Sequence, residues 1–149
     1  MSLKRVVSIS HDHATADDTI TLPHEARHLR RKKLTTDTGT DIAFDLPNAT
    51  HLHDGDTLAL DDGTRVSVRA AVEPLMSVTA ARTSHAELCW HIGNRHLPAQ
   101  LDPDRILLQR DPIIRTMLEG LGAQVEDIDA PFQPLAGAYH SHSHAENHD

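Results

Sequence analysis

Aromatic residues and cysteine are both scarce in this sequence. Its 149 residues include 1 Trp, 1 Tyr, 2 Phe and 1 Cys, so the core must be built mainly from aliphatic side chains. The lone Cys89 excludes an internal disulfide, and no apolar run approaches the roughly 20 residues of a membrane-spanning helix. The N-terminus also lacks the apolar segment of a secretory signal. We therefore expect a cytoplasmic protein without a membrane partner.

Positive charge is also in short supply, whereas histidine is abundant. The chain has 14 Lys and Arg against 22 Asp and Glu, which gives a formal net charge of -8. Nucleic acid is therefore not an expected partner, because binding phosphates requires a basic surface. The 13 histidines outnumber the aromatic residues more than threefold, and imidazole is the commonest metal ligand in proteins. This composition favours a protein that binds metal ions.

Several catalytic motifs are missing as well. The sequence has no G-x-S-x-G elbow, no phosphate-binding glycine loop and no Cys-x-x-Cys pair, so we expect a binding protein and not an enzyme. One alternative remains, because His24-Glu25-Ala26-Arg27-His28 matches H-E-x-x-H, in which two helical histidines hold zinc and the glutamate activates water. The match lies in a β-like region without an obvious third ligand. A zinc-dependent hydrolase is therefore the second hypothesis.

Residues 1–74 have the pattern of a small β-rich domain. Short alternating segments are separated by three turn signals, at Thr38-Gly39, Asp54-Gly55-Asp56 and Asp61-Asp62-Gly63, which predict antiparallel structure. In residues 64–70 the alternation places Val66 and Val68 inward. The basic run at residues 30–33 is expected to be a solvated strand face.

Residues 75–149 change to a helical period and predict an α+β fold. Ser84 is a suitable N-cap for a helix that begins near His85, and Asp111-Pro112 begins a second helix that ends at Gly122. The second helix is expected to bury Ile113, Ile114, Met117, Leu118 and Leu121. With strands at 75–80 and 124–128, and one or two further strands between the helices, the order is that of a ferredoxin-like (βαββαβ) domain. Beyond Ala130, and from about residue 131, a disordered His-rich tail that buries no core is expected.

Two groups of histidines are candidate metal ligands. His140, His142 and His144 alternate with serine, and His148 follows; a flexible chain can fold two or three such imidazoles onto one ion. A solvated polar tail or a purification tag is the alternative interpretation. His96 lies near the end of the first predicted helix, and His91 is turned away from it by about 140° along that helix, so they are not a preformed pair. Spacing alone leaves His96 undecided between a ligand and a structural residue.

One segment resembles a known signature. His91-Ile92-Gly93-Asn94-Arg95-His96-Leu97-Pro98-Ala99-Gln100 is similar to the G-N-R-H-x-x-x-Q motif of the UreE family of urease accessory proteins. Further similarities at residues 118–123, 130–132 and 137–140 extend the resemblance. Residues 54–56 resemble that family's N-terminal peptide-binding domain, so nearly the whole chain is covered.

The resemblance implies a nickel metallochaperone. In such a protein, His96 from both subunits of a homodimer meets a metal ion at the interface, and His140, His142 and His144 provide further ligands. Ni²⁺ would then pass to the urease apoprotein with the help of the accessory GTPase UreG. Zn²⁺ and Cu²⁺ are alternative ions, because most nitrogen and oxygen sites bind copper more tightly than nickel. A metal-storage or sensing protein is the third hypothesis.

Overall fold

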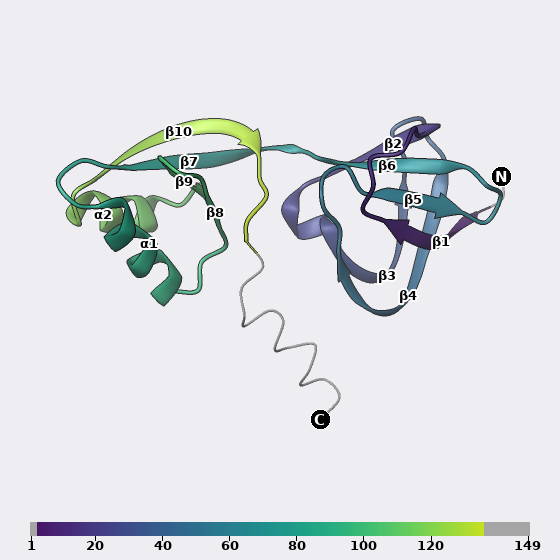
Figure 1. The fold of residues 1–149 in the computed structure, drawn as a ribbon, viewed down its shortest axis with the longest axis horizontal. Coiled ribbons are helices and arrows are strands. Elements are labelled where there is room, and N and C mark those ends of the chain that lie inside the picture. Colours follow the sequence, from purple (N-terminus) through teal and green to yellow (C-terminus); the bar gives the residue numbers. More distant parts are fainter. Residues whose placement is uncertain (1–2, 136–149) are drawn as a thin grey trace, which may run out of the picture. The chain divides into compact units, whose positions relative to one another are not determined.

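The computed structural model describes residues 3–135, which divide into two compact units (Figure 1). Unit 1 is Met1–Ala71 and unit 2 is Val72–Asp149, whereas the sequence suggested a boundary between residues 74 and 75. Within the described residues, no helix is long and apolar enough to cross a membrane.

Unit 1 is a curled six-stranded β-sheet with one short 3-10 helix (Figure 1). Its elements are β1 (Lys4–Ser10), β2 (Asp18–Leu22), η1 (His24–Arg27), β3 (His28–Thr35), β4 (Asp41–His51), β5 (Thr57–Leu60) and β6 (Arg65–Ala70). The strand order is β2-β6-β5-β1-β4-β3. The expectation of antiparallel structure holds for three strand pairs but is wrong for two, because β1 pairs with β4, and β2 with β6, in parallel.

The local predictions for unit 1 hold. Each of the three turn signals lies in a connection between strands, and Gly39, Gly55 and Gly63 all have a positive φ. Val66 and Val68 are buried, and Arg65 and Arg69 are exposed, as the alternation predicts. The core is aliphatic except for one ring, with its most buried members being Ile20, Ile42, Phe44, Leu52, Leu58, Val66 and Val68. The basic residues at 30–33 are exposed on β3.

Unit 2 has the ferredoxin-like order that the sequence predicts. Its elements are β7 (Val72–Ala80), α1 (His85–Asn94), β8 (Ala99–Leu101), β9 (Ile106–Gln109), α2 (Pro112–Gly120) and β10 (Ala123–Pro131). The sheet order is β10-β7-β9-β8, with every neighbouring pair antiparallel. Both helices cover the same face of this sheet (Figure 1).

The core under the helices explains why α1 and α2 are amphipathic. Leu88 and Ile92 of α1, together with Leu118 of α2, pack on the strands, and Cys89 lies at the edge of this cluster as a small core residue. The prediction for Ile113 is wrong, because its side chain is 78% exposed. One helical step of about 100° places Ile113 at the margin of the face formed by the other apolar residues of α2.

The opposite face of the unit 2 sheet is covered by the chain after β10. Leu75 and Leu107 alternate with residues under the helices, so they point to the other face, where Phe132 packs on them. Phe132 is fully buried. The expectation that the chain beyond Ala130 buries no core is therefore wrong at this residue.

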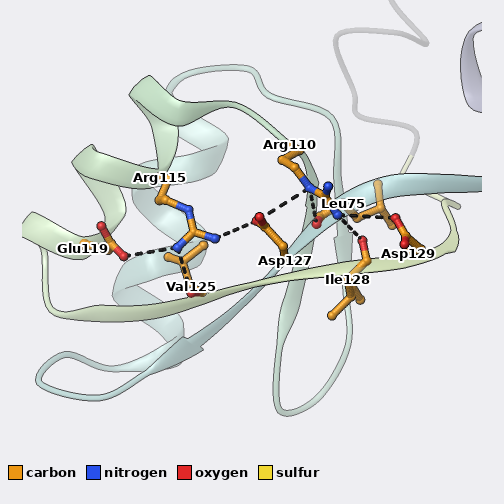
Figure 2. Close-up of polar contacts among 8 residues, drawn as sticks. All are labelled: Leu75, Arg110, Arg115, Glu119, Val125, Asp127, Ile128 and Asp129. Carbon is orange, nitrogen blue, oxygen red and sulfur yellow. Dashed lines mark hydrogen bonds and ion pairs between the residues drawn. The ribbon is translucent and has the colours of Figure 1, made fainter.

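Two arginines tie α2 and the preceding loop to β10 (Figure 2). Arg115 of α2 donates to the carbonyl oxygen of Val125 at 3.0 Å and to Oδ1 of Asp127 at 2.6 Å. Arg110 donates to the carbonyl oxygen of Ile128 at 2.9 Å. These bonds fix the helix over the strand that leads to the C-terminal segment.

Candidate metal centre

Helix α1 carries His96 at its C-terminal end. The Ser84 hydroxyl accepts a hydrogen bond from the Glu87 N–H at 3.1 Å, which confirms the predicted N-cap. Leu88 and Ile92 anchor the buried side of the helix to the sheet. The helix continues through Gly93 and ends at Asn94, so His96 follows its last turn by two residues.

His96 has a strained backbone conformation. Its φ of 57° is the one positive value for a non-glycine residue between residues 3 and 135. The His96 N–H donates to the carbonyl oxygen of Gly93 at 3.1 Å. Such a bond is typical of the left-handed residue that follows a helix, and this position is usually glycine. A left-handed conformation costs a residue with a side chain about 1–2 kcal/mol. Such strain is concentrated at functional sites, and the His96 side chain is exposed.

Gln100, the last residue of the signature, has a structural position in β8. Its Oε1 accepts the N–H of Gln133 at 2.9 Å, and its Nε2 donates to Asp102 at 3.3 Å. The N–H of Leu135 donates to the carbonyl oxygen of Ala99 at 2.9 Å. The chain after β10 is thus bound to the strand that begins three residues after His96.

The other predicted ligands lie outside the described residues. His140, His142 and His144, together with His148, fall in the segment 136–149. His96 is therefore the one predicted ligand among the described residues of unit 2. His91, in the last turn of α1, has its ring 5.0 Å from that of Trp90, measured between centroids.

The geometry at His24-Glu25-Ala26-Arg27-His28 does not fit a zinc hydrolase. Residues His24–Arg27 form a single 3-10 turn, and His28 has extended backbone angles at the start of β3. The H-E-x-x-H arrangement requires both histidines on one face of an α-helix. Arg27 is buried and donates to the carbonyl oxygen of Leu22 at 2.9 Å, so it joins this turn to the end of β2.

Three histidines of unit 1, His24, His51 and His53, lie with their rings close together. The His51 ring lies 5.1 Å from the His53 ring and 5.4 Å from the His24 ring. Burial lowers the pKa of His51 to about 4, and the nearby positive charge that His53 can carry adds to this effect. His51 is therefore neutral at pH 7. The sequence signal was the pair His51-Leu52-His53 beside the turn at residues 54–56.

Comparison with known proteins covers almost the whole chain. The family model "UreE urease accessory protein, N-terminal domain" matches residues 2–71, and "UreE urease accessory protein, C-terminal domain" matches residues 73–149. The urease accessory protein UreE of Chelativorans sp. (strain BNC1) is 51% identical over 141 residues, which cover 94% of this chain and 89% of that protein.

Two further relatives carry the same name. UreE of Rhizobium meliloti (strain 1021) is 49% identical, with 87% of this chain and 84% of the relative covered. UreE of Rhodobacter capsulatus is 48% identical, with 85% and 79% covered. All three are named as accessory proteins, which confirms the prediction of a protein that is not an enzyme. With both domain models matched in order and half of the residues identical, this chain belongs to the UreE family of urease accessory proteins.

Proposed function

We propose that this protein carries Ni²⁺ in the cytoplasm for assembly of the urease active site. Two copies would hold one ion between their His96 side chains, and His140, His142 and His144 would supply further, exchangeable ligands. The urease apoprotein and the accessory GTPase UreG are the proposed partners. Nickel is the cargo of this protein, and the ion leaves with the receiving protein.

The hydrogen bond from Leu135 to Ala99 carries this proposal. Ala99 follows His96 by three residues, and a chain extends by at most about 3.6 Å per residue, so Leu135 is anchored close to His96. His140 follows Leu135 by five residues, which allows a reach of up to about 17 Å. The C-terminal histidines can therefore approach the ion that His96 binds.

Ligand number is the argument for a homodimer. One imidazole is too few for an ion that takes four or more nitrogen and oxygen ligands, and a two-fold axis doubles the contribution of each chain. Trp90 on α1 is 65% exposed, and burying so large a ring favours association. A site shared between two chains and completed by exchangeable ligands can release its ion one ligand at a time.

Nickel titration by isothermal calorimetry tests the metal site. We expect one tight site per wild-type dimer. In His96→Asn the affinity should fall at least about tenfold, since even outer-shell changes cost that much. Asparagine tolerates a left-handed φ, so this variant preserves the fold. His91→Asn is the matched control on the same helix turn and should retain the site. Tight binding that survives in His96→Asn would contradict the proposal.

Delivery requires a separate measurement. Nickel-loaded protein is mixed with apo-urease and the accessory GTPase, and urease activity is followed over time in the presence of a competing chelator. Faster activation by wild type than by His96→Asn at equal total nickel is the expected result. Equal activation by both proteins would show that His96 is not needed for delivery, and no activation by either would favour storage over delivery.

A further inference from the structure

Three side chains of unit 1 converge at one end of β1 and β4. His11 follows β1 directly, and His53 and Asp56 lie in the connection from β4 to β5. Each residue offers one ligand atom, and these atoms all lie within 4.8 Å of one another. The group belongs entirely to unit 1 and shares no residue with the proposed nickel site.

The distances in this group suit a metal ion. Nδ1 of His11 lies 2.9 Å from Oδ1 of Asp56, and Nδ1 of His53 lies 3.8 Å from Oδ2 of the same carboxylate. Two ligand atoms that are each about 2.1 Å from a tetrahedral ion are about 3.4 Å apart. The two observed distances bracket this value, so small side-chain rotations can place all three residues around one ion.

The carboxylate is held in place by the backbone around it. The side chain of Asp56 is only 4% exposed, and its Oδ2 accepts the N–H of His53 at 2.9 Å. The Asp56 carbonyl oxygen also accepts the N–H of Val68 at 2.8 Å. Gly55 permits this turn with a φ of 90°. A preorganised carboxylate binds an ion without first losing conformational freedom.

The two imidazoles are the accessible part of the group. The side chains of His11 and His53 are 73% and 57% exposed, so an ion can enter from solvent and both rings can adjust. The hydrogen bond from the His53 N–H accounts for the buried carboxylate of Asp56, but it does not require two histidine rings from separate segments to face that carboxylate. Their convergence on one buried acid is the observation that points to a ligand.

We propose that His11, His53 and Asp56 form a second metal site, for a divalent first-row transition cation such as Zn²⁺, Ni²⁺ or Cu²⁺. Two nitrogen donors and one oxygen donor suit these ions, whereas Ca²⁺ and Mg²⁺ prefer oxygen ligands alone. Three protein ligands leave further coordination positions to water. The site would let unit 1 hold an ion independently of His96 and of the C-terminal histidines.

The test uses the full chain with the proposed nickel site removed. In this background protein His96 is replaced by Asn, and His140, His142, His144 and His148 are replaced by Ser. Calorimetric titration with ZnCl₂, NiCl₂ and CuCl₂ in turn should show one ion per chain for at least one metal. A background protein that binds none of the three would overturn the proposal. The outcome does not depend on whether His96 binds nickel.

Single substitutions in that background identify the ligands. His11→Asn and His53→Asn should each weaken binding at least about tenfold, since loss of a direct ligand exceeds the cost of an outer-shell change. Both side chains are exposed, so neither variant is expected to unfold. His13→Asn is the matched control, because its ring lies against Gly55 and outside the group. Retention of the ion in His53→Asn, or its loss in His13→Asn, would refute this ligand assignment.

Substoichiometric Cu²⁺ provides a direct readout of the ligand positions. In the NMR spectrum of the background protein, the ring protons of His11 and His53 should broaden before those of the other histidines. Earlier broadening of His24, His28 and His51 would place the ion elsewhere in unit 1 and overturn the assignment.

Discussion

Arg115 and Asp127 join α2 to β10 through a 2.6 Å hydrogen bond between Nη2 and Oδ1 (Figure 2). The same carboxylate oxygen lies 3.6 Å from Nε of Arg110, so it serves two guanidinium groups. The hydrogen bond with Asp127 raises the pKa of Arg115, so the ion pair stabilises the charged form of this arginine. Asp127 therefore links the helix, the loop before it and the last strand of unit 2.

Asp127→Asn should lower the melting temperature of unit 2. Asparagine keeps the size of the side chain but removes the charge that both arginines face. Because the pair is partly exposed, the loss should be smaller than that of Leu118→Ala, which empties a fully buried position. Differential scanning calorimetry at low and high salt measures the melting temperatures of both variants. Glu126→Gln, at the neighbouring exposed position, is the control, and an equal effect there would show that the loss is not specific to the pair.

The N-cap of α2 gives a second stability prediction. Oδ1 of Asp111 accepts the N–H groups of Ile113 and Ile114 at 2.8 and 3.1 Å. Asp111→Ala should reduce the free energy of unfolding by about 1 kcal/mol, because two N–H groups at the helix start lose their partner. Asp111→Ser, which can still cap, should lose clearly less in the same urea titration. Equal losses in the two variants would mean that the side-chain cap is not what stabilises the helix start.

Local signals predicted most of unit 2. Asp111-Pro112 and Gly122 define the limits of α2 because capping and left-handed turns depend on residues within a few positions of each other. The parallel pairs in unit 1 could not be predicted in this way. Alternation at residues 64–70 shows which side chains are buried, but it does not show whether β6 runs with or against β2.

His96 and the pair His11 and His53 also differ in whether the neighbouring sequence can identify them. His96 was identified through a contiguous signature, although its left-handed φ was not foreseen, because a histidine does not require that conformation. His11 and His53 are separated by more than forty positions. They meet because β1 pairs in parallel with β4 and antiparallel with β5, which brings the C-terminal ends of β1 and β4 to the start of β5. No spacing rule reports a contact that depends on strand pairing.

Asp37 should make unit 1 sensitive to acid. Its carboxylate accepts hydrogen bonds from the hydroxyl groups of Thr19 at 2.5 Å and Thr21 at 2.9 Å, joining the turn before β4 to β2. The bond from Thr19, followed by that from Thr21, lowers the pKa of Asp37 below 3.8 despite partial desolvation. A depressed folded-state pKa contributes stability above the unfolded value of 3.8, and this contribution is lost as pH falls through the folded value.

Asp37→Asn should therefore lower the free energy of unfolding at pH 6 by less than about 1 kcal/mol, since the carboxylate is exposed. The difference from wild type should disappear near pH 2. Urea titrations between these limits measure it, and Thr19→Val should reproduce part of the loss. A difference that stays constant to the lowest pH would show that the charge of Asp37 is not involved.

The strain at His96 predicts that stability and metal binding change in opposite directions. Glycine adopts a left-handed φ without steric cost, whereas alanine pays about 1–2 kcal/mol there. Glycine also loses about 0.5–1 kcal/mol more in backbone entropy on folding, so the net advantage of His96→Gly over His96→Ala lies between about 0 and 1.5 kcal/mol. His96→Gly should be at least as stable as wild type.

His96→Gly and His96→Ala both lack the imidazole and should lose the proposed nickel site. In His96→Gly the loss of binding would thus accompany equal or greater stability. Chemical denaturation of the metal-free proteins and nickel titration of the same samples test the two halves together. Asn94→Gly, inside the last turn of α1 where φ is helical, is the control and should destabilise the protein. If His96→Gly proved less stable than His96→Ala, the backbone at residue 96 would not be strained. The proposed role of the imidazole as a metal ligand would explain why a histidine occupies a position that favours glycine.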